Sequence, residues 1–327
     1  MDILAKRVWP VAKIIIPVIA IALLPLVADE FQLTIAVFIG INVIMVFGLS
    51  LLMGYAGQIS LGHAGLYGLG AYTTAIMTTR FSISPFITIV MGAIIAGLVA
   101  YLIGLPALRL KGHYLAMATL GAGIIIQVLF VELQPITMGP GGITGIPPLT
   151  LGKINLSETS HYFYVVYLIV LAVLWVSLSI VKSQKGRALR ALHENETAAS
   201  SIGINVEKHK LFIFAFSGVL AGIAGALYAH YALYVSPDTF GLNLSILIVI
   251  MVVIGGTENL FAAVLGAVLI TVISEYFREY QDYSLLFFGL SLVLIMIFAP
   301  RGLFVELAQL TKKLRNRYGI AKSRESY

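Results

Sequence analysis

The chain has 327 residues, of which 59% are hydrophobic and 11% charged, and its mean hydropathy is +0.97. Soluble domains carry about 25% charged residues, so this composition excludes a soluble monomer and indicates a polytopic membrane protein. The chain has no cysteine, which excludes disulfides, thiol nucleophiles and thiolate metal sites.

Apolar runs along the chain predict an all-α fold of transmembrane helices, each of which needs about 20 mainly apolar residues. About ten runs qualify, at 13–28, 33–53, 62–79, 85–105, 114–133, 161–181, 211–235, 244–254, 260–277 and 284–299. The third run begins in glycine-rich sequence and the eighth is short, so the number falls to eight if both are half-helices. No soluble insert or flexible linker separates the runs, so residues 1–327 are expected to form a single domain.

The positions of lysine and arginine predict the orientation, because these residues accumulate in cytoplasmic loops. With the N-terminus inside, 18 of the 21 basic residues lie in the cytoplasm, mostly in the loop 182–210 and the C-terminal tail 301–327. Both termini are therefore expected to be cytoplasmic and the loop 134–160 external. The formal charge of +6 then reflects topology and contact with anionic lipid head groups, so no nucleic-acid partner is expected.

The first apolar run has a second interpretation. Lys6, Arg7 and Lys13 precede it, as basic residues precede the apolar part of a signal peptide. The residues before Asp29 fit a cleavage site poorly, so an uncleaved first helix is the favoured interpretation.

Small residues recur every four positions in several runs, a pattern typical of helices that pack closely in lipid. Examples are Gly92 with Ala96, Gly218 with Gly222, and Ala221 with Gly225. A glycine-interrupted stretch also occurs in each half of the chain, at 54–70 and 255–266. This pattern indicates a two-fold internal repeat with a pathway between its halves.

The glycine-rich stretch Gly54–Tyr72 is the first candidate for function. Six glycines within residues 54–70 disfavour a uniform helix and predict a broken one. Broken backbone is tolerated inside a membrane only where it lines a cavity or is buried in protein. The residues expected to border a translocation pathway are therefore Gln58, Ser60, Gly62, His63 and Gly65. The alternative is tight packing with His63 bonded to a carbonyl group, and for His63 alone this alternative is preferred.

The second candidate is the cytoplasmic stretch 185–205, which predicts a short amphipathic helix parallel to the membrane. Leu189 and Leu192 share one helical face, and Ala199 and Ile202 repeat their spacing. A glycine follows at 203, where it suits a C-terminal cap. Acidic residues in the middle, Glu194 and Glu196, disfavour a purely lipid contact and favour a protein partner.

Motifs of catalysis are absent from the sequence. His193-Glu194 begins like a zinc-protease motif, but position 197 is threonine, so the second histidine ligand is missing. Gly152-Lys153 continues with isoleucine, which excludes a P-loop and hydrolysis of ATP at such a site. No catalytic residue, metal site or cofactor of this chain is therefore expected. The sequence lacks the catalytic residues that an intramembrane enzyme needs. It also lacks the deeply placed carboxylates that a proton-relay transporter needs.

These residues resemble the permease subunits of branched-chain amino-acid ABC transporters, the LivH/LivM family, and its LivM type more closely than its LivH type. The resemblance runs from about Asn42 to Phe304. Its specific parts are Gly54–Tyr72, the loop Gly139-Pro140-Gly141-Gly142-Ile143-Thr144-Gly145-Ile146-Pro147, the segment Gly186–Asn205, and Ala299-Pro300-Arg301-Gly302-Leu303-Phe304. One departure lies at 255–263, where the family commonly has further glycines, so a pathway role carries over less securely to that segment.

The resemblance implies half of the translocation pathway of an importer for branched-chain amino acids in a bacterial or archaeal cytoplasmic membrane. It implies a LivH-like sister permease, two ATPase subunits that bind ATP and Mg²⁺, and an extracytoplasmic binding protein. The loop 182–210 would then dock on an ATPase, as the EAA loop of ABC importers does. The residues implied in this coupling are Gly186, Arg187, Leu189, Arg190, Leu192, Glu194, Asn195, Glu196, Ala199 and Gly203. The alternative from another class is an autonomous secondary transporter or channel for small amides such as urea.

Overall fold

A computed structural model describes residues 23–151, 154–156 and 158–277, with short pieces at 289–290, 293, 302–303 and 305–306. The predicted spans 13–28 and 284–299 lie largely outside the described residues, as does most of the predicted tail 301–327. Within the described ranges the chain is mainly helical, and its strands have two residues each.

The other eight predicted spans each correspond to a helix. These helices are α2 (Glu30–Ser50), α3 (His63–Phe81), α4 (Pro85–Ala107), α5 (His113–Glu132), α7 (Thr159–Lys182), α10 (Val206–Ala232), α11 (Leu242–Gly255) and α12 (Leu260–Tyr276). Five of them, namely α2 with the turn that follows it, α4, α5, α7 and α10, are long and apolar enough to cross a membrane. Helices α11 and α12 are apolar but shorter. The prediction of an all-α, membrane-type fold is therefore confirmed.

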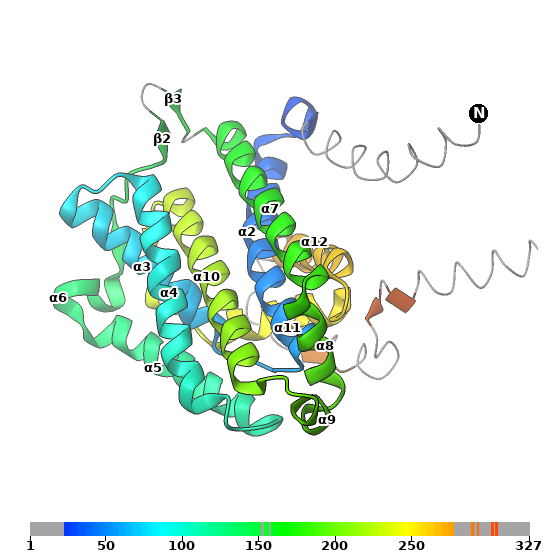
Figure 1. The fold of residues 1–327 in the computed structure, drawn as a ribbon. Coiled ribbons are helices and arrows are strands. Elements are labelled where there is room, and N and C mark those ends of the chain that lie inside the picture. The colour runs from blue at the N-terminus through cyan, green and yellow to red at the C-terminus, as the bar shows by residue number, and fades with distance from the viewer. Residues whose placement is uncertain are drawn as a thin grey trace, which may run out of the picture.

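Two helices form the centre of the bundle. Helix α2 packs against α7, α10, α11 and α12, while α10 also packs against α3 and α4 (Figure 1). In the most apolar stretch of α2 and its following turn, 83% of the residues are buried, against 22% in α7. The outer helices α4, α5 and α7 turn apolar side chains outward, as expected for contact with lipid or another subunit.

Glycines bring three of these helices close together. A Cβ atom placed on Gly222 of α10 would lie 2.6 Å from the carbonyl oxygen of Gly92 in α4. A Cβ atom on Gly70 of α3 would overlap the carbonyl group of Gly222, and one on Gly225 would overlap that of Tyr67. The predicted close packing through small residues is confirmed at this contact between α3, α4 and α10.

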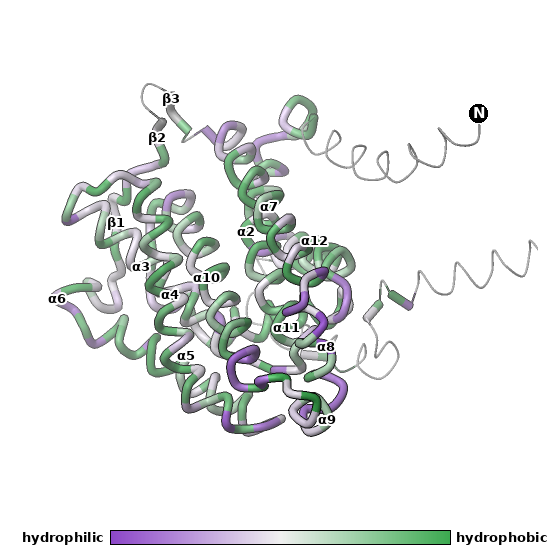
Figure 2. Tube along the Cα trace, in the orientation of Figure 1, coloured by the Kyte–Doolittle hydropathy of each residue, from purple (hydrophilic) through white to green (hydrophobic). Residues whose placement is uncertain are grey.

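The polar connections lie at the ends of the bundle. Helices α8 (Gln184–Glu194) and α9 (Glu196–Ser201) form hydrophilic turns at the end opposite the hairpin of β2 (Thr150–Leu151) and β3 (Ile154–Asn155) (Figures 1 and 2). The connection from α5 to α7 also contains α6 (Gln134–Thr137), a 3₁₀ turn Gly139–Gly141 and β1 (Ile143–Thr144). Strand β1 pairs antiparallel with β4 (Tyr234–Val235), which precedes a 3₁₀ turn Pro237–Phe240.

Candidate functional site

The glycine-rich stretch is broken, but at one place only. Helix α2 passes into a π-helical turn, Leu51–Tyr55, and the chain then runs without helix from Gly57 to Gly62 before α3 begins at His63. Gly57 has φ +64°, a conformation that favours glycine. Residues 63–81, with three of the six glycines, form a continuous helix. The sequence therefore predicted the break correctly but spread it over too many residues.

Two backbone N–H groups at the break are bonded to hydroxyl groups of other helices. The N–H of Leu61 donates to Thr119 Oγ1 of α5 at 3.1 Å, and the N–H of Ala64 donates to Ser245 Oγ of α11 at 3.1 Å. Both hydroxyl groups are buried. They supply the partners that a helix N-terminus inside a membrane needs. Sequence reasoning missed Thr119 and Ser245, whose only signal is that they are hydroxyl residues within apolar spans.

The predicted pathway residues Ser60 and His63 belong to a buried polar cluster. His63 is 1% exposed, and its Nδ1 and Nε2 atoms lie 3.0 Å from Ser60 Oγ and 3.1 Å from Ser217 Oγ of α10. The Ser217 hydroxyl in turn donates to the carbonyl group of Phe214 at 2.8 Å. The partners of His63 are thus two hydroxyl groups rather than the expected carbonyl, and they join the break to α10.

Gln58 lies in the middle of the break and is 5% exposed. Its amide nitrogen donates to the carbonyl group of Ala56 at 3.1 Å. Its Oε1 atom is buried without a hydrogen-bond partner in the described part of the chain. A buried carbonyl of this kind is costly unless something bonds it, so Gln58 is the predicted pathway residue with an unused acceptor.

Gly62 and Gly65 pack against α5. A Cβ atom on Gly62 would overlap the carbonyl group of Thr119, and one on Gly65 would lie 3.1 Å from the Cα atom of Gly123. The structure thus gives both glycines a packing role. Their predicted place beside a translocation pathway stays a prediction.

Replacing Gly62 with alanine is expected to destabilise the protein by about 1–3 kcal/mol, because the new methyl group displaces the backbone of α5. The matched control is Gly121→Ala in α5, where an added Cβ atom meets nothing within 4 Å. Thermal unfolding of the two purified variants in detergent measures the difference. Equal midpoints for both variants would contradict the packing role of Gly62.

The second glycine-interrupted stretch meets the first. Helix α11 ends at Gly255, and a turn with Gly256 at φ +121° leads into α12. Gly54 in the π-helical turn lies against the carbonyl group of Thr257, which also accepts a hydrogen bond from Ser50 Oγ at 3.0 Å. Gly302, from the predicted C-terminal motif, contacts Gly256. These segments, far apart in sequence, therefore lie together at one end of α2.

The loop 182–210, which the sequence predicts to be cytoplasmic, folds as two helices rather than the single helix expected. Asn195 separates them, because it adopts an extended conformation (φ −160°, ψ 108°) and its Oδ1 accepts from the N–H of Ala198 at 3.0 Å as the N-cap of α9. Gly203 (φ +87°) ends α9, and the N–H of Ile204 bonds the carbonyl group of Ala199 at 3.1 Å. The predicted glycine C-cap is confirmed.

The apolar face of this loop is buried within the chain itself. Leu189, Leu192 and Ala199 are each 2% exposed or less, and α8 packs against α7, α10 and the π-helical turn. The sequence favoured a protein partner for this loop, but helices of the same chain already cover its apolar face. The coupling role of the loop stays a prediction. Ile202, which was expected to continue the buried face, is 75% exposed.

Gly186 and the two arginines attach α8 to the end of α7. A Cβ atom on Gly186 would overlap the carbonyl group of Val181, so only glycine allows this approach. Arg190 Nη2 donates to that carbonyl group at 3.0 Å, and Arg187 Nη1 donates to the carbonyl group of Lys182 at 3.4 Å. The last carbonyl groups of a helix need such donors, and positive charge there is favourable.

Glu196 attaches α9 to the bundle. Lys210 in α10 is 3% exposed, and its ammonium group donates to Glu196 Oε1. Lys111, in the connection between α4 and α5, has its ammonium group 3.5 Å from Glu196 Oε2. One carboxylate therefore links the loop to α10 and to the connection between α4 and α5. Sequence reasoning named Glu196 but not its two lysine partners, which lie far from it in the chain.

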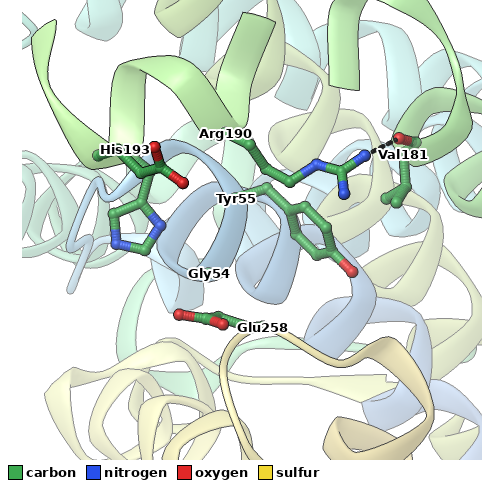
Figure 3. Close-up of a pocket in the computed structure, with 7 residues that line it drawn as sticks. Gly54, Tyr55, Val181, Arg190, His193 and Glu258 are labelled. Atoms are coloured by element: carbon green, nitrogen blue, oxygen red, sulfur yellow. Dashed lines mark hydrogen bonds between the residues drawn. The ribbon is translucent and has the colours of Figure 1, made fainter. Parts of the chain in front are cut away.

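A cavity of about 360 Å³ separates α8 from the π-helical turn and from the turn between α11 and α12. Figure 3 shows Arg190 and His193 projecting from α8 toward Tyr55 and Glu258. The ring of His193 also lies against Gly57, where an added Cβ atom would be 2.9 Å from its Cδ2 atom. The loop thus touches the break directly. Within the described ranges, no group of three or more histidine, cysteine, aspartate or glutamate residues is arranged to hold a metal ion.

Comparison with known proteins places this architecture in a family. Residues 31–297 match the family model described as branched-chain amino acid transport system / permease component. The chain is 35% identical over 283 residues to the high-affinity branched-chain amino acid transport system permease protein LivM of Escherichia coli K12, covering 80% of this chain and 66% of that protein. The LivM protein of Salmonella typhimurium LT2 is 34% identical over the same shares.

A more distant relative belongs to the sister type. The probable branched-chain amino acid transport permease protein LivH of Methanocaldococcus jannaschii is 27% identical over 253 residues, which cover 72% of this chain and 79% of that protein. The chain spans just under two thirds of the length of the two LivM relatives. No solved structure matches it significantly. The chain belongs to the family of branched-chain amino acid transport system permease components.

Proposed function

We propose that the chain is the permease subunit of an ABC importer and forms half of a translocation pathway for branched-chain amino acids. The observation that carries the proposal is the family match over residues 31–297, and the relatives named for this transport support it. The chain moves its substrate without transforming it. ATP and Mg²⁺ are bound and hydrolysed by partner subunits, in keeping with the lack of a P-loop in the sequence.

The proposed complex contains a LivH-like sister permease, two ATPases and an extracytoplasmic binding protein. Matches to relatives of both the LivM and the LivH type support a pair of related permeases. The exposed apolar faces of α4, α5 and α7 provide surface for a second membrane subunit and for lipid. The loop 182–210 is proposed to contact an ATPase and to move when ATP is bound and hydrolysed. This movement is proposed to reach the broken segment through the contact of His193 with Gly57.

The proposed architecture is one domain of about ten spans with a two-fold repeat. The meeting of the two glycine-interrupted segments at Gly54 and Thr257 supports this arrangement, because a repeat interface brings such segments together. Gln58, Ser60 and His63 are proposed to border the pathway, and the Oε1 atom of Gln58, which has no hydrogen-bond partner among the described residues, supports this proposal.

The proposed orientation places both termini and α8–α9 in the cytoplasm of a bacterial or archaeal cell. Single cysteines at Gln184 and Thr144, both exposed, test it in this cysteine-free chain. A membrane-impermeant thiol reagent is expected to label Thr144→Cys in intact cells and Gln184→Cys only after the cells are opened. The reverse pattern would contradict the orientation.

Transport itself is tested by reconstitution. Proteoliposomes that hold the chain with its sister permease and ATPases, supplied with the binding protein, are expected to take up radiolabelled leucine only with ATP. A lone chain driven by an ion gradient is expected to be inactive. Uptake by the lone chain would contradict the proposal and would favour an autonomous transporter.

A further inference from the structure

The cavity beneath α8 holds charges of both signs that do not pair with one another. Arg190 and His193 line it from α8, and Glu194 and Glu258 line it as well. The ion pairs within the described residues join Glu196 to two lysines and Glu158 to His161, so none of them connects two groups of the cavity. Separated opposite charges around an open space suit a ligand that carries both charges itself.

The positive side of the cavity is held in place. Arg190 donates from Nη2 to the carbonyl group of Val181 at 3.0 Å and from Nε to that of Gly186 at 3.4 Å. An arginine side chain has five N–H groups, so these two bonds fix the guanidinium group and leave donors for a carboxylate. The ring of Tyr55 lies below it and brings a hydroxyl group (Figure 3).

One negative group, Glu194, lies at the end of α8, and the other comes from a different element. Glu258 is an exposed residue of the turn between α11 and α12, and it faces Arg190 and His193 across the cavity (Figure 3). A volume of about 360 Å³ lies at the lower end of the range for ligand pockets, about 300–1,000 Å³. It suits one small molecule with an ammonium and a carboxylate group, and Val181 offers an apolar wall for a side chain.

We propose that this cavity binds a free α-amino acid from the cytoplasm, with the carboxylate at Arg190 and Tyr55 and the ammonium group at Glu258. The inference rests on the proposed function, which supplies the cytoplasmic position and the chemical class of the product. The bound amino acid connects α8, the π-helical turn and the turn between α11 and α12. It therefore favours the arrangement in which these three elements are close, and an amino acid that accumulates inside the cell slows its own import.

The first test uses ligands that lack one charge. In proteoliposomes with the complete complex and internal ATP, internal leucine is expected to lower the initial rate of leucine uptake. Leucinamide lacks the carboxylate and 4-methylpentanoate lacks the ammonium group, while both keep the side chain. Each is expected to inhibit at least about tenfold more weakly than leucine, because one charge-assisted contact is lost. Equal inhibition by either analogue would overturn the proposal.

The second test changes the protein. Glu258→Gln is expected to weaken inhibition by internal leucine about tenfold, measured relative to its own uptake without internal leucine. The matched control is Glu207→Gln, an exposed carboxylate at the start of α10 and outside the cavity, which is expected to keep wild-type inhibition. Inhibition unchanged in Glu258→Gln would overturn the proposal.

Direct binding separates this inference from the proposed function. Equilibrium dialysis of radiolabelled leucine with the purified complex in detergent, without binding protein or ATP, is expected to show binding that Glu258→Gln weakens. Binding of this kind in a complex that does not import leucine would support the site and contradict the proposed function. Binding to the isolated chain but not to the complex would overturn the inference, because an ATPase would then fill the cavity.

Discussion

Replacing Glu196 with alanine is expected to weaken the attachment of α9 to the helix bundle by about 2–3 kcal/mol. Lys210 is 3% exposed, so the substitution leaves a buried ammonium group without its carboxylate. The destabilisation is smaller than that caused by breaking a fully buried ion pair, because the Glu196 side chain is 26% exposed. Uptake is expected to fall strongly, since the loop is no longer fixed to the helices that it would move.

The measurement combines thermal unfolding of the purified chain in detergent with uptake in proteoliposomes. Glu207→Ala is the matched control, because it removes an exposed carboxylate nearby, and it is expected to behave like the wild type. The double variant Glu196→Ala/Lys210→Met removes the buried charge too and is expected to recover most of the lost stability. Wild-type stability in the Glu196 single variant would show that the ion pair does not hold the loop.

The same carboxylate predicts a dependence on pH. Partial burial alone would raise the pKa of Glu196, but the hydrogen bond from Lys210 and the charges of Lys210 and Lys111 outweigh it and hold the pKa below its ordinary value. A lowered pKa stabilises the folded chain above the unfolded-state pKa of about 4.3, and this stabilisation is lost as the pH falls through the lower, folded-state value. Glu196→Gln is therefore expected to lose less stability than the wild type over that range.

The sequence predicted the features that periodicity and composition determine. Apolar runs located α2 to α5, α7 and α10 to α12, because helices inside a membrane consist mainly of apolar residues. The glycines of Gly54–Tyr72 predicted a break but not its position at 57–62. A glycine that breaks a helix and one that lets two helices touch, such as Gly65 beside Gly123, look the same in a single sequence.

The contacts that complete the site depend on tertiary structure. His63 and Ser217 are 154 positions apart, and Ala64 and Ser245 are 181 apart. A single sequence does not show which helix lies beside the break. The loop illustrates the same limit, because an amphipathic pattern predicts that Leu189 and Leu192 are buried but does not say against which protein. The structure answers that the chain's own helices cover them.

This difference changes which residue of the loop is expected to bind an ATPase. Leu192 is 2% exposed, whereas Ile202 at the end of α9 is 75% exposed. An exposed apolar side chain among polar neighbours is a candidate for burial in a partner. We therefore expect Ile202, rather than Leu192, to contact an ATPase directly.

Two variants separate direct contact from support of the loop. Ile202→Glu places a charge in the proposed interface and is expected to weaken ATPase binding by about 2 kcal/mol, roughly 30-fold, while the chain alone keeps its wild-type unfolding midpoint. Leu192→Ala opens a cavity between α8 and the bundle and is expected to destabilise the chain itself by about 2–5 kcal/mol. Co-purification of the ATPases and thermal unfolding of the isolated chain, measured on both variants, give the two effects separately.

Because Ile202 contacts little of its own chain, a loss of ATPase binding in Ile202→Glu at unchanged stability has no intramolecular explanation. Wild-type binding in Ile202→Glu, together with loss of binding at full stability in Leu192→Ala, would show instead that the loop turns its leucine face toward the ATPase.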